Sequence, residues 1–367
     1  MWWLLSCIIP YFTIFFCIWI GLRKIKPYKV TQGEDQKSWH PMISILIAVK
    51  NEETNIGSLL KCLIIQDYPS SELEVIVIDD HSEDKTCSVV QEYCKQYSNI
   101  HLLSNTGEGK KLAINTGLNH SSGELIVTTD ADCKIKPGWL STIAGFYRQY
   151  NPDLIIGPVD FITKKGCFGW FNELEFLSLQ AVTAGSAALK HPVIVSGANL
   201  AFQKQDSSDY LEYIHPEIPS GDDMFLLQYI KKRKGNIYWI DSDEATVQTS
   251  GDNKLNKIIS QRARWAGKGI ALTDTDTILL ALITLLTNLF IIFSLIEGIF
   301  NPEYLKLALC FYLLKAIPDL LILYKSAGMR NKRNLLWFFI PSELLYPFYL
   351  ITISILGIIN HRNWKQV

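Results

Sequence analysis

Two carboxylates separated by one small residue follow a run of strand-forming residues. Residues 125–129 read LIVTT, and Asp130 and Asp132 come directly after them. A strand this apolar is expected to be buried in a sheet, so the two charges mark the place where the chain leaves the sheet. Hard oxygen ligands of this kind suit Mg²⁺ or Mn²⁺, which proteins hold with few carboxylates and the phosphates of a substrate. A pair of this kind is a weak signal by itself and needs other residues beside it.

Polar and acidic residues also follow two other apolar runs. Asp79 and Asp80 close the run LEVIVID, and Asn51 and Glu52 follow the run ISILIAV. A single acidic residue at the end of a strand is more often a turn or a helix cap. Several of them on one rim of a sheet indicate a binding site.

Two later segments carry further candidate residues. Asp222 and Asp223 precede an apolar helix, where they could also serve only as caps that favour the helix dipole. In QRARW, Gln261, Arg264 and Trp265 are spaced i, i+3 and i+4, so a helix presents them on one face. Arginine can bind a diphosphate with two hydrogen bonds, and tryptophan offers a flat surface to a sugar ring. An amphipathic helix at a membrane surface is the alternative interpretation.

Strands and helices alternate through the middle of the chain. The pattern predicts strands at 43–49, 73–79, 100–104 and 124–129, with amphipathic helices between them. Short connections between alternating elements indicate a parallel sheet covered by helices. In such sheets ligands bind at the carboxyl ends of the strands, and the acidic residues fall at these ends.

The apolar residues are concentrated at the two ends of the chain. Residues 1–22 contain no charged side chain and are long enough to span a bilayer, and further apolar stretches lie at 277–300, 304–324 and 335–359. A cleaved signal peptide is the alternative for the first segment, but it lacks a basic amino-terminal region and a small-residue cleavage site. The formal net charge of −1 argues against a nucleic-acid partner. Lipids of the membrane are therefore expected as partners.

The basic residues predict the orientation of these segments. Arg23, Lys24 and Lys26 follow the first segment, and the loop at 325–333 is also basic, which places both on the cytoplasmic side. Eight cysteines without paired spacing are then expected to be reduced thiols. Lys315 and Asp319 are spaced to form an ion pair inside the segment at 304–324.

The last segment has two interpretations. A simple crossing would put the chain end outside, whereas Pro341, Glu343 and Pro347 could break the segment into a re-entrant hairpin. We expect the simple crossing. Residues 166–190 are also rich in apolar side chains, and they are either interfacial or part of the core of the soluble domain.

Together these motifs resemble those of the family 2 glycosyltransferases, in the membrane-embedded branch that includes cellulose, chitin and hyaluronan synthases. The resemblance covers about residues 42–270 and the flanking apolar segments. It is carried by ISILIAVKNEE, VIVIDDHSED, GKKLAIN, DAD, GANLAF, GDDMFLL and QRARW. Two positions depart from the family pattern: Ala48 stands where proline is commoner, and Asp222 replaces a glutamate.

The resemblance implies a fold, a reaction and roles for the residues. The fold is an α/β GT-A fold, Rossmann-like with a mostly parallel sheet, in a cytoplasmic domain flanked by one amino-terminal and about three carboxyl-terminal transmembrane helices. The reaction is an inverting transfer from a nucleotide-diphospho-sugar, in which uridine diphosphate is the expected nucleotide, to a lipid or glycan acceptor. Asp223 is the implied general base. Asp132, with help from Asp130, would hold Mg²⁺ or Mn²⁺ against the diphosphate.

The remaining residues have implied binding roles. Asp79 or Asp80 would read the base and Lys110 would support the base or the phosphates, next to Asn51 and Glu52. Arg264 would offset charge on the departing diphosphate. Gln261 and Trp265 belong to the same element, and Trp265 would contact the acceptor.

Three regions and two alternative functions complete the prediction. The regions are an anchor at 1–22, a glycosyltransferase domain at 42–270 and a transmembrane region at 277–360. A membrane transport or export partner is one alternative, and an inactive regulator that binds a nucleotide sugar is the other. About four spanning segments are few for a transporter, and an intact set of acidic residues argues against the regulator.

Overall fold

The computed structural model describes residues 6–30, 40–204, 213, 215 and 221–364. The chain forms two compact units. We call residues 26–160 with 195–250 the sheet unit, and residues 1–25, 161–194 and 251–367 the helical unit. Residues 161–194 and 251–270, which the sequence suggested as part of one domain at 42–270, thus belong to the helical unit.

The sheet unit contains a seven-stranded sheet with the order β3-β2-β1-β4-β7-β5-β8. Strands β3, β2, β1 and β4 are parallel, β7 is antiparallel to both β4 and β5, and β8 is parallel to β5. The expected α/β architecture with a mostly parallel sheet is confirmed. The strands are β1 (Ile43–Val49), β2 (Leu73–Asp79), β3 (Ile100–Ser104), β4 (Leu125–Thr128), β5 (Leu154–Ile156), β7 (Leu200–Gln203) and β8 (Ile237–Trp239), and β6 (Val159–Ile162) pairs with β9 (Val247–Ser250) in a separate two-stranded sheet.

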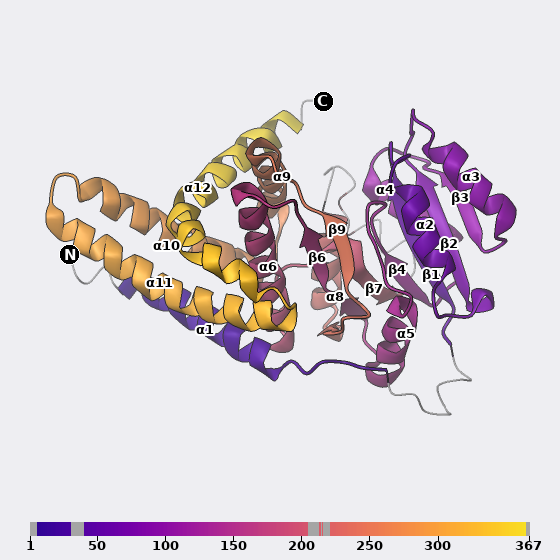
Figure 1. The fold of residues 1–367 in the computed structure, drawn as a ribbon, viewed down its shortest axis with the longest axis horizontal. Helices are drawn as coiled ribbons and strands as arrows, with labels where there is room; N and C mark the ends of the chain where they lie inside the picture. The colour runs from indigo at the N-terminus through magenta and orange to yellow at the C-terminus, as the bar shows by residue number, and fades with distance from the viewer. Residues whose placement is uncertain (1–5, 31–39, 205–212, 214, 216–220, 365–367) are drawn as a thin grey trace. The chain divides into compact units, whose positions relative to one another are not determined.

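Helices cover the sheet because their apolar residues recur at helical spacing. In α2 (Ile56–Ile64), Ile56, Leu59, Leu60 and Leu63 are all buried. The strands between the helices are buried along their whole length in β1 and β2, apart from Ala48, which explains their continuous apolar runs. The other helices of the unit are α3 (Thr86–Gln96), α4 (Lys110–His120), α5 (Trp139–Tyr150) and α8 (Asp222–Lys232) (Figure 1), and short 3₁₀ turns lie at Ser70–Glu72 and Gly197–Asn199.

Glu74 is a buried charged residue near the start of β2. Its carboxylate accepts hydrogen bonds from the Ser44 hydroxyl on β1, from the Ser122 N–H at 2.5 Å and from the Gly123 N–H at 3.3 Å. Burial alone would raise the pKa of this carboxyl, but the hydrogen bonds outweigh burial and lower the pKa. Glu74 therefore joins the starts of three neighbouring strands.

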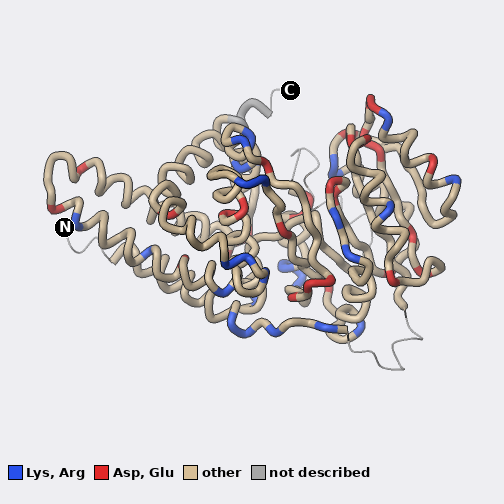
Figure 2. The backbone as a smooth tube through the Cα atoms, viewed as in Figure 1, with Lys and Arg blue, Asp and Glu red and all other residues tan. Residues whose placement is uncertain are grey.

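The helical unit contains the apolar segments. Four of its helical stretches, at Ser6–Lys24, Thr275–Glu297, Pro302–Met329 and Arg333–Ile359, are long and apolar enough to cross a membrane. Figure 2 shows that charged residues are sparse along α1, α10 and α11. The helices are α1 (Ile9–Lys24), α6 (Cys167–Ala188), α9 (Leu255–Lys268), α10 (Thr275–Glu297), α11 (Pro302–Met329) and α12 (Phe339–Trp364), with 3₁₀ turns at Gly269–Ala271 and Arg333–Phe338.

Helices α1 and α6 approach each other at two glycines. A Cβ added to Gly21 would lie 2.2 Å from the carbonyl oxygen of Gly185, and one added to Gly185 would lie 2.5 Å from the carbonyl oxygen of Ile18. Only glycine permits backbones to approach this closely. The segment at 166–190 thus packs against the amino-terminal apolar helix and is not part of the core of the sheet unit.

A cluster of ionisable residues is buried among α1, α11 and α12. The Lys315 ammonium group, 1% exposed, lies 2.8 Å from Asp319 and 2.6 Å from Glu343. The Tyr11 hydroxyl donates to the Asp319 carboxylate at 2.9 Å. The expected ion pair between Lys315 and Asp319 is confirmed, and the sequence did not indicate that Glu343 and Tyr11 join it. The cluster connects three apolar helices through paired charges, as intramembrane ionisable residues require.

Helix α12 continues through both prolines of its segment. It runs without interruption from Phe339 to Trp364 with Pro347 inside it, so the prolines do not end the helix. Its second half lies against α9, where a Cβ added to Gly267 would be 2.9 Å from the carbonyl oxygen of Gly357. Phe338 and Ile353 belong to one apolar cluster, although a straight helix would separate them by about 22 Å. The helix therefore bends, as Figure 1 shows, and Pro347 accounts for the bend.

Candidate functional site

The turn after β1 is joined to the turn after β2. The Asn51 N–H donates to the Ser82 hydroxyl at 2.9 Å, and its side-chain oxygen accepts from the Glu83 N–H at 2.8 Å. Asn51 has a φ of 56°, in the left-handed region where asparagine is tolerated better than most residues. The Glu52 N–H donates to the Thr86 hydroxyl at 2.7 Å. In this structure, Asn51 and Glu52 therefore shape the rim of the sheet.

Asp79 and Asp80 have different hydrogen-bond partners at the end of β2. The Asp80 carboxylate accepts from the Asn105 amide at 2.7 Å and from the Gly109 N–H at 2.9 Å. The Asp79 carboxylate accepts from the Ser82 N–H at 3.2 Å. Asp80 thus holds the loop that leads into α4, and Gly109 itself has a φ of 90°, which favours glycine.

Lys110, the first residue of α4, lies between two acidic groups. Its ammonium group is 2.6 Å from Asp130, which follows β4, and 3.9 Å from Asp222 at the start of α8. Desolvation lowers the pKa of Lys110, but the carboxylates of Asp130 and Asp222 outweigh it and raise the pKa above its ordinary value. Lys110 therefore stays protonated and brings the two acidic motifs of the sequence to one place.

Asp132 has surroundings that differ from those of Asp130. One carboxylate oxygen of Asp132 accepts a hydrogen bond from the Thr249 hydroxyl at 2.7 Å. Burial raises the pKa of this carboxyl, and the hydrogen bond from Thr249 partly opposes the rise. A cation beside Asp132 would favour its charged form, because an opposite charge nearby offsets the effect of burial.

The residues around Asp132 fit a hard divalent cation. Within the described residues, no group of three or more His, Cys, Asp or Glu side chains could hold a metal ion by itself. The Asp130 and Asp132 pair would therefore supply part of an oxygen shell and leave positions for ligands from a substrate. Burial raises the pKa of the adjacent Cys133 thiol to about 12, which keeps this sulfur protonated and disfavours softer metals.

Asp223 is oriented by two backbone N–H groups. Its carboxylate accepts from the Gly197 N–H at 3.2 Å and from the Met224 N–H at 2.8 Å. Gly197 is itself held by the Thr128 hydroxyl, which donates to its carbonyl oxygen at 2.9 Å. Because Asp223 lies at the start of α8, the helix dipole also favours its charged form.

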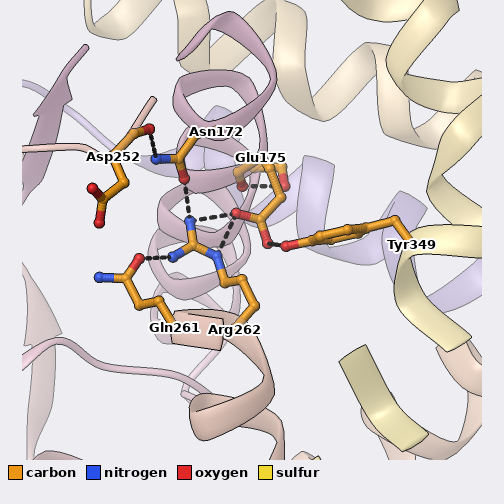
Figure 3. Close-up of polar contacts among 7 residues, drawn as sticks. Asn172, Glu175, Asp252, Gln261, Arg262 and Tyr349 are labelled. Carbon is orange, nitrogen blue, oxygen red and sulfur yellow. Dashed lines mark hydrogen bonds and ion pairs between the residues drawn. The ribbon is translucent and has the colours of Figure 1, made fainter. Parts of the chain in front are cut away.

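The QRARW segment lies on α9, in the helical unit. Gln261 and Trp265 are half-buried and Arg264 is exposed. Arg262, which the spacing argument passed over, is 2% exposed and forms an ion pair with Glu175 of α6 at 2.6 Å. Figure 3 shows Arg262 surrounded by Asn172, Glu175 and Gln261.

A family comparison identifies the domain to which the rim of the sheet unit belongs. Residues 44–209 match the family described as glycosyl transferase family 2. The chain carries a family 2 glycosyltransferase domain. The match begins in β1 and includes the carboxyl ends of β1, β2 and β4, where Asn51, Asp79, Asp80, Asp130 and Asp132 lie.

Individual relatives agree with this assignment over parts of the chain. Glycosyltransferase AglE of Haloferax volcanii is 35% identical over 127 residues, which are 34% of this chain and 42% of the relative. Beta-monoglucosyldiacylglycerol synthase of Nostoc sp. is 36% identical over 112 residues, 30% of this chain and 24% of the relative. Poly-beta-1,6-N-acetyl-D-glucosamine synthase of Staphylococcus epidermidis is 26% identical over 239 residues, 62% of this chain and 54% of the relative. The chain thus matches less than two thirds of the length of each of these relatives.

A solved structure has the same fold. A mannosyltransferase from Pyrobaculum calidifontis, solved with GDP-mannose and Mn²⁺, superimposes with a TM-score of 0.58 at 18% sequence identity. The match covers 96% of this chain and 98% of the other. The expected GT-A architecture of the glycosyltransferase domain is confirmed.

Several residues that orient the candidate groups of the site were not found from the sequence. Thr249 binds Asp132 across more than a hundred residues of chain, and no spacing could indicate this contact. Glu175 and Asn172 could have been noticed in the sequence. Two polar residues spaced i, i+3 inside an apolar helix usually have buried hydrogen-bond partners. That partner is Arg262.

Proposed function

We propose that the protein is an inverting glycosyltransferase that moves a sugar from a nucleotide-diphospho-sugar, a UDP-sugar, to a lipid-linked or polysaccharide acceptor. The observation that carries the proposal is the position of Lys110, whose ammonium group pairs with Asp130 at 2.6 Å and lies 3.9 Å from Asp222. The DAD motif and the GDD motif thereby meet on one rim of a family 2 glycosyltransferase domain. One motif can hold the donor while the other activates the acceptor.

Asp223 is the proposed general base. In a single displacement, the acceptor hydroxyl attacks the anomeric carbon, the bond to the diphosphate breaks, and Asp223 takes the hydroxyl proton. The backbone N–H groups of Gly197 and Met224 hold the Asp223 carboxylate in place, so that it can meet a hydroxyl within hydrogen-bond distance.

The donor is held by the residues at the ends of β2 and β4. Asp79 or Asp80 reads the base, next to Asn51 and Glu52. Asp130 and Asp132 would hold Mg²⁺ or Mn²⁺, which would neutralise charge on the diphosphate leaving group. Lys110 is close enough to Asp130 to offer its ammonium group to a phosphate oxygen.

Two residues of α9, in the helical unit, also have proposed roles. Arg264 is exposed and, in the described part of the chain, takes part in no ion pair, so its guanidinium group can bind the departing diphosphate. Trp265 offers a ring to the acceptor. The apolar helices of the helical unit support a location in the membrane, and the basic residues Arg23 and Lys24 favour a cytoplasmic catalytic domain.

Turnover of a nucleotide sugar tests this function. The purified protein is incubated in detergent with a panel of radiolabelled nucleotide sugars, with and without a membrane lipid extract, and release of the nucleotide diphosphate is measured. We expect turnover by the unaltered protein and its loss in Asp132→Ala. Asp243→Asn, which changes an exposed aspartate of the sheet unit, is the matched control and should retain turnover. Binding without turnover would instead support the regulator, and absence of both would support a transport partner.

A further inference from the structure

We propose that Arg262 is a positioning residue that turns Gln261 into a fixed hydrogen-bond donor and holds the ring of Trp265 for an acceptor. The inference rests on the proposed function, because it concerns how the acceptor is met. It adds to that function a role for a buried arginine, which orients its neighbours and does not itself contact the substrate.

The guanidinium group of Arg262 is almost fully used by the protein. Its Nε donates to Glu175 at 2.8 Å, and its Nη2 donates to the same carboxylate oxygen at 2.6 Å and to the Asn172 side-chain oxygen at 2.9 Å. Its Nη1 donates to the Gln261 side-chain oxygen at 2.7 Å. Four of the five N–H groups of the guanidinium thus have partners, and the group is 2% exposed. Arg262 cannot also bind a substrate phosphate, which leaves that task to the exposed Arg264.

These contacts fix the orientation of the Gln261 amide. A guanidinium group has no acceptor, so only the oxygen of Gln261 can face it. Figure 3 shows the amide nitrogen of Gln261 on the side away from Arg262. Among the described residues, this nitrogen has no hydrogen-bond partner. A half-buried donor whose orientation is fixed suits a hydroxyl or carbonyl oxygen of a sugar or of a lipid headgroup.

Arg262 also contacts the ring of Trp265. The guanidinium carbon lies 4.2 Å from the centre of the Trp265 ring, which is a cation–π distance. Phe176 of α6 packs beside the same ring with the centres 6.3 Å apart. Arg262 and Phe176 thus both lie beside the ring while it remains half-buried. Gln261 and Trp265, four residues apart on α9, then offer one polar and one flat apolar contact on the same face.

The partners of Arg262 are themselves anchored. Asn172 donates its amide to the carbonyl oxygen of Asp252 at 2.9 Å, and the Tyr349 hydroxyl of α12 is 3.5 Å from Glu175. Loss of solvation lowers the pKa of Arg262, but the Glu175 carboxylate outweighs it and raises the pKa. Arg262 therefore stays charged, and its contact with the Gln261 oxygen does not depend on a proton.

The substitution Gln261→Glu tests the role of the outward amide nitrogen while it keeps the contact with Arg262 that stabilises the fold. The new carboxylate keeps an oxygen toward Arg262, and it replaces the outward N–H₂ group by an acceptor. We expect the thermal midpoint to be unchanged or raised, because a charged partner now faces Arg262. We expect the apparent half-saturating concentration of a total polar lipid extract in detergent micelles to rise by about tenfold or more. Hydrolysis of the donor without lipid is measured beside it, so that weaker use of the acceptor is distinguished from weaker use of the donor.

Substitutions at two basic residues of α9 complete the experiment. Arg262→Lys keeps the charge but loses the planar fork, and it should raise the half-saturating lipid concentration with little change in donor hydrolysis. Lys257→Gln, at an exposed position of the same helix, is the control and should change neither quantity.

The outcomes distinguish this inference from the proposed function. A normal half-saturating lipid concentration in both Gln261→Glu and Arg262→Lys, with turnover intact, overturns the positioning role and leaves the glycosyltransferase proposal in place. A lowered thermal midpoint in Gln261→Glu overturns the assigned orientation of the amide. Absence of turnover in the unaltered protein overturns both proposals.

Discussion

Asp130 and Asp132 are one residue apart and have different partners. Asp130 pairs with the Lys110 ammonium group, whereas Asp132 accepts a hydrogen bond from the Thr249 hydroxyl. Asp223 accepts hydrogen bonds from the backbone N–H groups of Gly197 and Met224. Each carboxylate of the site therefore has its own hydrogen-bond surroundings, and variants of single residues should give different defects.

Asp223→Asn and Asp132→Asn should affect different steps. We expect Asp223→Asn to lower transfer by about 10²–10⁴-fold with nearly unchanged binding of the nucleotide sugar, because the base acts on the acceptor. Asp132→Asn should weaken donor binding as well. A donor-binding titration in the presence of Mn²⁺, together with initial rates, separates the two effects. Equal loss of donor binding in both variants would contradict the proposed division of roles.

Removal of divalent cations should abolish transfer. The oxygen-only ligand set at Asp130 and Asp132, next to a thiol that stays protonated, predicts a requirement for Mg²⁺ or Mn²⁺. Activity is measured in excess chelator and again after each ion is added back. Full activity in chelator would show that this assignment is wrong, and rescue by Zn²⁺ alone would show that softer ligands contribute.

The candidate groups were found from the sequence, but their surroundings were not. Asp130, Asp132 and Asp223 could be predicted from their positions. Several carboxylates at the ends of buried strands and at the start of a helix indicate a binding site. Arg262 could not be chosen over Arg264, because both lie in a short polar segment and only the packing of α6 against α9 decides which one is buried. Contacts between segments that are far apart in the chain leave no periodic signal.

At the scale of elements, Glu74 predicts a stability that depends on pH. The folded-state pKa of this carboxyl is lowered, so its contribution is present above the unfolded pKa of about 4.3 and is lost as the pH falls through the folded pKa. Glu74→Gln should lower the free energy of unfolding by about 1.5–3 kcal/mol at pH 7 and by less near pH 3. Thermal unfolding at both pH values measures this difference.

The exposed Glu92 of α3 provides the control for this prediction. Glu92→Gln should leave stability unchanged at either pH. A constant deficit of Glu74→Gln from pH 7 to pH 3 would mean that the hydrogen bonds, and not the charge, carry the effect.

The close approach of α1 and α6 predicts a strict requirement for glycine. Gly21→Ala would place a methyl group 2.2 Å from the backbone oxygen of Gly185, so the helices must separate. We expect a loss of about 1–3 kcal/mol of stability, measured as unfolding in detergent. Gly57→Ala on α2, where the new methyl would meet Val89 at an ordinary 3.5 Å, should be neutral or stabilising by up to about 1 kcal/mol.

The strands and helices of the sheet unit were largely predictable because each has a clear apolar period. The expected strand at 100–104 coincides with β3, and the expected helix at 110–120 coincides with α4. The role of α6 was left open, because an apolar helix has the same composition in a soluble core and beside a membrane helix. The contact between Gly21 and Gly185 shows that α6 packs against the apolar helix α1.

At the scale of the whole molecule, the bend of α12 changes the expected position of the carboxyl terminus. If α10 and α11 cross as a hairpin, the start of α10 and the end of α11 lie on one side of the membrane. Gly357 packs against Gly267, a few residues before α10 begins. The second half of α12 then returns toward the side on which it started, and α9 covers its backbone, as such a path requires.

A cysteine at position 367 tests this topology. Val367 lies outside the described residues, as does Lys365. We expect Val367→Cys, in a background without accessible thiols, to stay unlabelled by an impermeant thiol reagent in intact cells and to be labelled after permeabilisation. Labelling of intact cells would instead support the simple crossing. A cysteine in the short turn at 298–301, between α10 and α11, is the positive control for labelling from outside.

The contact between Asp80 and Gly109 has a consequence for how the site responds to a ligand. Asp80 binds the N–H of Gly109, and Lys110 follows Gly109 in the chain. A ligand that donates a hydrogen bond to Asp80 competes with the Gly109 N–H for this carboxylate. Under the proposed function, a base that binds Asp80 would compete with Gly109, and the residue after Gly109 is the lysine proposed to meet the phosphates. The loop at 105–109 would then couple the two parts of the donor site.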